Sequence, residues 1–340
     1  MQEGSYGEFS LALHRRAVQQ RIPLEGAIEA TQRCNLSCVH CYNNLPSSDL
    51  AARRSELTYE EHCRILDEIT EAGCLWLLYT GGEIFLRPDF LNIYTYAKQK
   101  GLLITLFTNG TLLTPKSADY LSEWRPFSVE ITLYGRTKET YERVTGVPGS
   151  FEKCMRGIRL LMERKLPLKL KAVVMNLNVH EIWDLKRFVE EDLGLEFRFD
   201  AMINPRIDGS RRPTQVRLRP EEIVQLDVQD PKRMAEWKRF VEKFCGSPRS
   251  PQRPHRLYEC GGGVGSFTVD PTGGLSICVL SREDVYDLRN GRFSDGWDGF
   301  IYSLRQREIA RIRGTPYLSR GLPTLGAGLL LPQPPPKRSL

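Results

Sequence analysis

Short apolar runs rich in β-branched and aromatic residues alternate with amphipathic helical patterns from Leu24 to about Ile203. The runs are Gly26–Thr31, Leu75–Thr80, Leu102–Asn109, Phe127–Tyr134, Leu168–Met175 and Glu196–Ile203. Residues typical of helix ends lie between them: Thr58 with Glu61 as a capping box, Gly73, Gly101 and Pro115. Six β-α units in succession predict a parallel sheet with right-handed crossovers, either an open (β/α)6 barrel or a doubly wound sheet.

The two faces of the later strands help to decide between these folds. Val129 and Ile131 share one face of their strand, whereas the other face is polar. Strands of a doubly wound sheet are buried on both sides and should be apolar throughout. We therefore expect an α/β fold, a partial (β/α)6 TIM-like barrel with helices outside and a polar cavity inside. The residues expected to line that cavity are Glu130, Arg198 and Asp200.

Composition changes divide the chain into five expected regions. They are an N-terminal extension (1–25), the barrel (26–205), a helical bridge (206–254), a small module (255–313) and an irregular tail rich in Pro and Gly (314–340). In the bridge, helices are expected around Pro220–Leu226 and Pro231–Phe244. In the module, Asp270–Gly274 (DPTGG) separates two β-rich runs and predicts a hairpin.

The composition also limits the class of protein. Lys and Arg exceed Asp and Glu by 48 to 42, but the basic residues are spread along all 340 residues, so nucleic acid is not an expected partner. No apolar segment resembles a signal peptide or a membrane span, which predicts a cytoplasmic protein without membrane attachment. The nine cysteines are odd in number, and the cytosol keeps thiols reduced, so metal or cluster ligation is their expected use.

Three cysteines lie close together in the segment Arg33–Tyr42, RCNLSCVHCY. Their spacing is C-x3-C-x2-C, directly after the first predicted strand. Three thiolates can hold one corner of an iron–sulfur cubane and leave the fourth iron open to another ligand. The alternative is a structural zinc site completed by His40 or a distant residue.

This spacing after a first strand resembles the radical S-adenosylmethionine (radical SAM) superfamily. TGGE at Thr80–Glu83 is similar to the GGE element of that family, and Thr108–Thr114 is similar to its turn after the third strand. Ile131–Phe151 resembles the peptide-modifying branch, although this branch usually has Asp where the chain has Tyr134.

The resemblance implies two cofactors. A [4Fe–4S] cluster would be held by Cys34, Cys38 and Cys41. S-adenosyl-L-methionine would be bound by Gly81, Gly82, Glu83, Asn109, Thr132 and Arg143. Of these, Glu83 would receive the amino group, while Thr132 and Arg143 would contact the ribose or carboxylate. No residue is assigned a catalytic role toward the substrate.

The resemblance also implies a reaction and its partners. Reductive cleavage of S-adenosyl-L-methionine would give a 5′-deoxyadenosyl radical that abstracts hydrogen from a substrate. The implied substrate is a ribosomally made peptide, of the kind that quinone-cofactor or thioether-peptide maturases process. A flavodoxin or ferredoxin would be the electron donor. The alternatives are a non-catalytic metal-binding or interaction protein that keeps the fold, or a truncated, inactive maturase.

The C-terminal module resembles the SPASM/twitch extension of peptide-modifying radical SAM proteins. Cys260 and Cys278 frame the hairpin and are candidate ligands of an auxiliary cluster, with Cys245 as a conceivable third. The further cysteines of the full extension are missing, and the Pro- and Gly-rich tail suggests a diverged, truncated or frame-shifted end. The expectation is therefore one complete cluster and an incomplete auxiliary site.

Overall fold

The computed structural model describes residues 6–43, 45–245, 258 and 260–307. Its barrel strands are β1 (Glu25–Thr31), β4 (Trp76–Gly81), β5 (Leu103–Thr108), β6 (Ser128–Thr132), β7 (Leu168–Val173) and β8 (Glu196–Asp200). The helices between them are α2 (Leu50–Ser55), α3 (Tyr59–Glu71), α4 (Phe90–Gln99), α5 (Pro115–Glu123), α6 (Lys138–Thr145), α7 (Ser150–Glu163) and α8 (Ile182–Arg187). Two short strands, β2 (Arg33–Cys34) and β3 (Leu45–Pro46), pair beside the cysteine motif.

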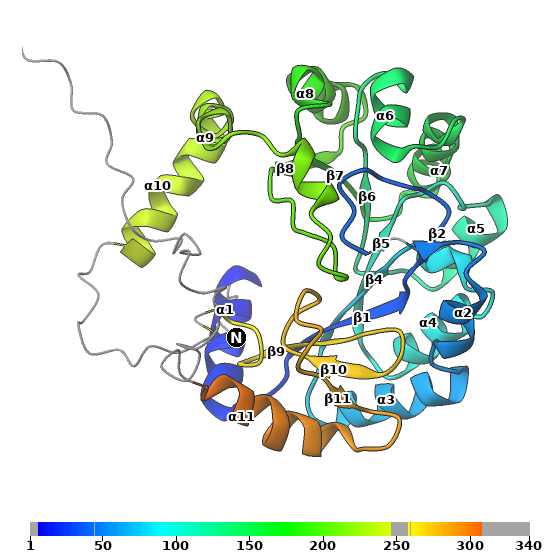
Figure 1. The fold of residues 1–340 in the computed structure, drawn as a ribbon, viewed down its shortest axis with the longest axis vertical. Coiled ribbons are helices and arrows are strands. Elements are labelled where there is room, and N and C mark those ends of the chain that lie inside the picture. The colour runs from blue at the N-terminus through cyan, green and yellow to red at the C-terminus, as the bar shows by residue number, and fades with distance from the viewer. Residues whose placement is uncertain (1–5, 44, 246–257, 259, 308–340) are drawn as a thin grey trace, which may run out of the picture. The chain divides into compact units, whose positions relative to one another are not determined.

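The barrel strands form a parallel sheet in the order β1-β4-β5-β6-β7-β8. Helices α3 to α8 lie around the outside of these strands (Figure 1). Each predicted strand is present, with ends shifted by at most a few residues. The expected partial barrel of six β-α units is confirmed.

Alternation along the strands separates a packed outer face from a polar inner face. Val129, Ile131 and Leu170 are fully buried toward the helices. On the opposite face of the sheet, Glu130 and Lys171 form an ion pair across β6 and β7. The predicted division of faces is therefore confirmed.

Local sequence accounts for the helix ends. The Thr58 hydroxyl accepts from the backbone N–H of Glu61, whose carboxylate accepts in return from the Thr58 N–H. Pro115 occupies the first turn of α5. Gly73 and Gly101 follow the C-cap residues of α3 and α4, Ala72 and Lys100, and have positive φ angles, as expected for glycines that end helices.

The C-terminal segment Cys260–Arg305 joins the barrel in one compact unit. Its hairpin strands β9 (Ser266–Val269) and β10 (Gly274–Ser276) are antiparallel, and β11 (Tyr286–Asp287) pairs with β10. The Asp270 carboxylate accepts from the backbone N–H groups of Thr272 and Gly274, which fixes the predicted turn. Strand β9 pairs in parallel with β1, so the sheet of the described residues runs β11-β10-β9-β1 and on to β8.

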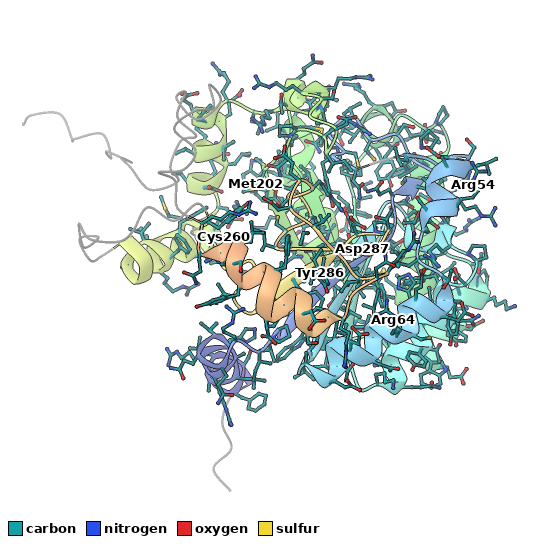
Figure 2. The ribbon with its side chains drawn as sticks, turned by 60° about the horizontal axis from the view of Figure 1, so that its bottom comes forward. Arg54, Arg64, Met202, Cys260, Tyr286 and Asp287 are labelled. Carbon is teal, nitrogen blue, oxygen red and sulfur yellow. The ribbon has the colours of Figure 1, made fainter. Side chains whose placement is uncertain are left out.

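A side chain of a barrel helix makes a hydrogen bond to this C-terminal segment. Arg64 of α3 donates to the carbonyl of Leu288 just after β11. Figure 2 labels Arg64 together with Tyr286 and Asp287 of β11. The segment ends in a helical stretch, η5 (Asp295–Ile301) followed by α11 (Tyr302–Arg305). How the barrel and module boundaries divide the chain into domains stays a prediction.

Helices before and after the barrel strands belong to the N-terminal extension and the bridge. The helix α1 (Tyr6–Gln20), which was not predicted, precedes β1, and its Ala17 side chain is buried. The bridge contains α9 (Pro220–Gln229) and α10 (Pro231–Cys245), as expected, and residues from Val224 to the end of α10 belong to a second compact unit. The Cys245 side chain and the expected tail lie outside the described residues. No helix of the described part is long and apolar enough to span a bilayer.

Candidate active site

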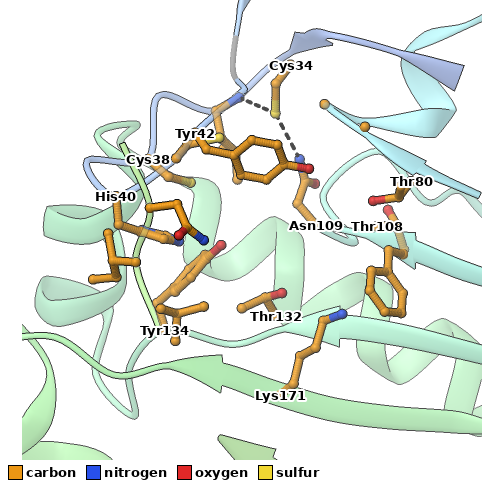
Figure 3. Close-up of a pocket in the computed structure, with 18 of the residues that line it drawn as sticks. Cys34, Cys38, His40, Tyr42, Thr80, Thr108, Asn109, Thr132, Tyr134 and Lys171 are labelled. Carbon is orange, nitrogen blue, oxygen red and sulfur yellow. Dashed lines mark hydrogen bonds between the residues drawn. The ribbon is translucent and has the colours of Figure 1, made fainter. Parts of the chain in front are cut away.

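A cavity of about 570 Å³ opens at the carboxyl ends of the parallel strands. Cys34, Cys38 and Cys41 line it on one side. Figure 3 shows Thr132 and Lys171 across the cavity from Cys34. Ligands of α/β proteins bind at this end of the strands. The three cysteines of the motif are therefore brought together where a cofactor can enter.

Backbone N–H groups are aimed at the cysteine sulfurs. The Leu36 N–H lies 3.4 Å from Cys34 Sγ, and the Asn43 N–H lies 3.4 Å from Cys41 Sγ. Burial, with smaller contributions from Glu83 and Cys41, raises the pKa of Cys34 to about 12. Burial also raises the pKa of Cys38 well above its ordinary value, and both neighbouring cysteines add to the shift. These thiols become thiolates when a cationic partner such as iron binds them.

The donor set fits an iron–sulfur cubane with one open iron. The three thiolates that hold such a cubane each bind a different iron, and the three cysteines of the motif line one cavity. Donors aimed at the sulfurs are also the hydrogen bonds that tune such clusters.

Two glycines let the end of β4 pass close to the cysteine loop. A Cβ on Gly82 would lie 2.2 Å from the Arg33 carbonyl oxygen, and one on Gly81 would lie 2.2 Å from that of Thr31. Gly81 also has a φ of 124°, which strains any other residue. Both glycines line the cavity, so their backbone is open to a ligand at the place expected for the cofactor.

Glu83 is placed at the end of β4 as expected, but its carboxylate faces the protein interior. It is fully buried and accepts from Thr108 Oγ1 at 2.7 Å, the Asn109 N–H at 2.7 Å and the Phe85 N–H at 3.2 Å. Burial raises its pKa, against these hydrogen bonds. Glu83 is not among the residues that line the cavity. Its role as partner of an ammonium group stays a prediction, while its contacts fix the turn after β5.

Asn109 connects that turn to the cysteine loop. Its side-chain amide donates to Asn35 Oδ1 at 2.9 Å and lies 3.7 Å from Cys34 Sγ. Its Oδ1 accepts from Thr111 at 2.6 Å. Asn109 lines the cavity, so the structure places it at the site in contact with the first cysteine.

Aromatic side chains lie beside Cys38 in the cavity. Tyr134 interacts with the Cys38 thiol, and its ring meets that of His40 edge-on at 4.9 Å. The buried Nδ1 of His40 has no hydrogen-bond partner in the described part of the structure. Thr132, for which a contact with the ribose or carboxylate of the cofactor was expected, also lines this cavity. Tyr134, which departs from the pattern of the peptide-modifying branch, is thus a residue of the cavity.

A charged group forms on the inner faces of the last three barrel strands. Lys171 Nζ lies 3.2 Å from Glu130 Oε2 and 2.8 Å from the centre of the Phe107 ring. Arg198 donates to the same Glu130 oxygen. Lys171 and Asp200 line the cavity directly, whereas Glu130 and Arg198 support it through this ion-pair network. The expectation for Asp200 is confirmed, and that for Glu130 and Arg198 is corrected to a supporting position, because Glu130 accepts from both Lys171 and Arg198.

Three further predicted residues lie away from this cavity. Arg143 is exposed in the last turn of α6, so the structure does not bring it to the site, and its role stays a prediction. Cys260 and Cys278 come from neighbouring segments: a Cβ on Gly262 would lie 3.7 Å from Cys260 Sγ and 2.6 Å from the Ile277 carbonyl oxygen. Cys278 lines a second cavity together with His14 and Glu25. Whether the two cysteines share a cluster stays a prediction.

Lys171 was not predicted as a site residue, although its position on the polar strand face indicated it. Burial lowers its pKa from 10.5 to about 8, partly opposed by Glu130. Between these pH values the unfolded chain binds more protons than the native one, so rising pH favours the native state. We expect the stability of the wild type relative to Lys171→Met to increase by roughly 3 kcal/mol from pH 8 to 10.5. Urea unfolding of both proteins across this range measures it, and parallel pH profiles would contradict it.

The partial barrel with three cysteines at the mouth of its cavity defines a class of protein. Residues 28–189 match the model of the radical SAM superfamily. A PqqA peptide cyclase of Rhodopseudomonas palustris is 32% identical over 277 residues, which cover 79% of this chain and 72% of the relative. The chain belongs to the radical SAM superfamily.

Other relatives are similar over different parts of the chain. An AdoMet-dependent heme synthase of Methanosarcina barkeri is 36% identical over 156 residues, which are 46% of this chain and 44% of that protein. The chain thus covers less than half the length of this relative. Streptococcus suis SuiB bound to S-adenosylmethionine has a similar fold, with a TM-score of 0.64 and 15% identity over 90% of this chain and 75% of SuiB.

Proposed function

We propose that the chain is a radical SAM enzyme that modifies a peptide. When bound, a reduced [4Fe–4S] cluster and S-adenosyl-L-methionine supply a 5′-deoxyadenosyl radical that abstracts hydrogen from the substrate. The observation that carries the proposal is one cavity that is lined by three cysteine thiols and also by Thr132, Lys171 and Asp200, with Lys171 across from Cys34 (Figure 3).

The chain's own residues bind and orient the two cofactors. Cys34, Cys38 and Cys41 would each bind one iron of the cluster, and the N–H groups of Leu36 and Asn43 would stabilise the sulfurs to which they point. The backbone at Gly81 and Gly82 leaves room for the amino acid part of the second cofactor. Thr132 offers a hydroxyl to its ribose.

The rest of the cavity is the proposed place of the substrate. Met202 lines it and is 67% exposed, so the cavity reaches solvent beside β8 (Figure 2 labels Met202). A peptide can enter from this side, with Asp200 and Lys171 as its polar contacts. The R. palustris peptide cyclase, similar over most of this chain, supports a peptide over a smaller substrate. The electron donor is a flavodoxin or ferredoxin that binds from outside.

Iron analysis and cofactor cleavage test this function together. Protein purified and reconstituted without oxygen should hold about four irons and four sulfides per chain, as one cubane requires. With dithionite it should convert S-adenosyl-L-methionine to 5′-deoxyadenosine. A protein that binds iron but forms no 5′-deoxyadenosine would be the non-catalytic alternative. About eight irons, with the excess lost in Cys260→Ala and Cys278→Ala, would show that an auxiliary cluster forms.

A change at Asp200 is expected to affect conversion of the substrate more than cleavage of S-adenosyl-L-methionine. Asp200 lines the cavity, and its Oδ1 accepts from the backbone N–H of Met202 at 2.9 Å. We expect Asp200→Asn to lower peptide conversion by about tenfold, the loss of one charged contact, and to change uncoupled 5′-deoxyadenosine formation by less than about twofold. Glu196→Gln, four residues earlier on the same face of β8, is the control. Equal losses in both reactions of Asp200→Asn would contradict a substrate contact.

A further inference from the structure

A buried carboxylate links the cysteine loop to the C-terminal segment. Glu29 lies on β1 and is fully buried. Its Oε1 accepts from Asn43 Nδ2 at 2.8 Å and from the Tyr42 hydroxyl at 3.3 Å, both at the end of the cysteine motif. Its Oε2 accepts from Arg282, which follows Cys278 by four residues. One carboxylate therefore joins two segments that are 240 residues apart in sequence.

Arg282 makes this arrangement possible. Its side chain is 15% exposed, and its only other carboxylate partner in the described structure is Asp270, at 3.6 Å in the hairpin turn. Burial raises the pKa of Glu29, and Arg282 opposes that shift. A buried carboxylate without its cation becomes protonated or moves toward water. The position of Glu29 thus depends on a cation from the C-terminal segment.

The link continues to a cysteine. The side chain of Asn43 is held by Glu29, and its backbone N–H points at Cys41 Sγ at 3.4 Å. The Cys41 N–H in turn donates to the Cys38 carbonyl at 3.1 Å, which closes the turn between the two cysteines. Hydrogen bonds to ligand sulfurs and the groups that orient them set the affinity and potential of a cluster.

We propose that Arg282 and Glu29 are positioning residues through which the C-terminal segment holds the cysteine loop in its ligating conformation. The proposal rests on the proposed function for its consequence in the enzyme, namely retention and reduction potential of the cluster. It assigns the C-terminal segment a role toward the three-cysteine site that does not depend on Cys260 or Cys278.

Alkylation of the iron-free chain tests the loop itself. In Arg282→Met, Cys38 and Cys41 should react with N-ethylmaleimide about tenfold faster than in the wild type, the size of effect typical of residues that orient ligands. Arg289→Met is the matched control, because Arg289 also ties the C-terminal segment to the barrel, through Glu61 at 3.3 Å and the Ser55 carbonyl at 2.7 Å. Peptide mass spectrometry gives the rate for each cysteine. Equal rates in Arg282→Met, Arg289→Met and the wild type would overturn the proposal.

A double variant distinguishes positioning from general destabilisation. Because both residues act through one link, Arg282→Met should change the alkylation rates much less in a Glu29→Gln background than in the wild type. Arg282→Lys, which keeps the cation, should restore most of the wild-type rate. Additive effects of Arg282→Met and Glu29→Gln, or rates that follow only the melting temperature, would overturn it.

The reconstituted protein provides the readout in the presence of the cluster. Arg282→Met should release iron to a chelator about tenfold faster than Arg289→Met and shift the midpoint potential measured by EPR. If the wild type binds no iron, the proposed function is wrong, but the alkylation rates still test whether Arg282 and Glu29 position the cysteine loop. If Arg282→Met has the same cluster potential and the same rate of iron release as the wild type, the positioning role of Arg282 and Glu29 is wrong, while the proposed function is unaffected.

Discussion

Replacement of Cys34, Cys38 or Cys41 by alanine is expected to abolish both the cluster and the cleavage of S-adenosyl-L-methionine. All three thiols line one cavity, and a methyl group cannot ligate iron. We expect less than about one iron per chain, and 5′-deoxyadenosine formation at least about a hundredfold below wild type. Iron analysis and chromatography of the reaction products measure the two effects.

A cysteine outside the cavity serves as the control for this experiment. Cys63 lies on α3 and is half-buried, so Cys63→Ala removes a thiol without touching the site. It should keep the full iron content and the full rate. Wild-type amounts of 5′-deoxyadenosine from a protein that lacks all three cysteines of the motif would exclude a cluster at this place.

Replacement of Glu83 by alanine is expected to destabilise the iron-free protein by about 3 kcal/mol or more, because each buried donor left unpaired costs about 1–3 kcal/mol. The donors are Thr108 Oγ1 and the N–H groups of Asn109 and Phe85. Loss of these hydrogen bonds also leaves the turn after β5 without support. This turn positions Asn109 beside Cys34, so cofactor cleavage should be lost as well. Denaturant unfolding and 5′-deoxyadenosine formation measure the two losses.

A second variant at this position separates two roles of the carboxylate. Glu83→Gln keeps the shape and one acceptor oxygen, and it should retain more stability than the alanine variant. If the glutamine variant unfolds like the wild type but no longer binds S-adenosyl-L-methionine, Glu83 contacts the cofactor directly. An alanine variant with wild-type stability would contradict the structural role.

Local patterns were sufficient to predict the barrel but not its first helix. The alternation of Val129 and Ile131 with polar neighbours holds in the structure because each strand has one face against helices and one toward a cavity. Helix α1 has no such pattern, since Phe9 is 60% exposed and Val18 is 50% exposed. Its contact with β1 is between residues far apart in the pattern, His14 and Glu25 at 2.7 Å, and a periodicity argument does not detect such a contact.

In the site, too, features that depend on neighbouring residues could be predicted from the sequence, whereas contacts between distant residues could not. The spacing of Cys34, Cys38 and Cys41 predicted one ligand loop, and the cavity confirms that they lie together. The interior orientation of Glu83 depends on the register of β4 against β5, which the motif alone does not contain. The pair of Glu29 and Arg282 joins residues from opposite ends of the chain, so no sequence window includes both.

The parallel pairing of β1 with β9 has a consequence for synthesis. Glu25 of β1 pairs with Ser266 of β9. The edge of β1 that faces β9 therefore stays uncovered until about 240 further residues have been synthesised. Contacts between such distant residues form slowly, and an open strand edge invites pairing with other chains. During translation the nascent barrel is therefore open beside its cysteine loop. We expect this interval to be both the time of greatest aggregation risk and the time at which iron and sulfide reach the loop most easily.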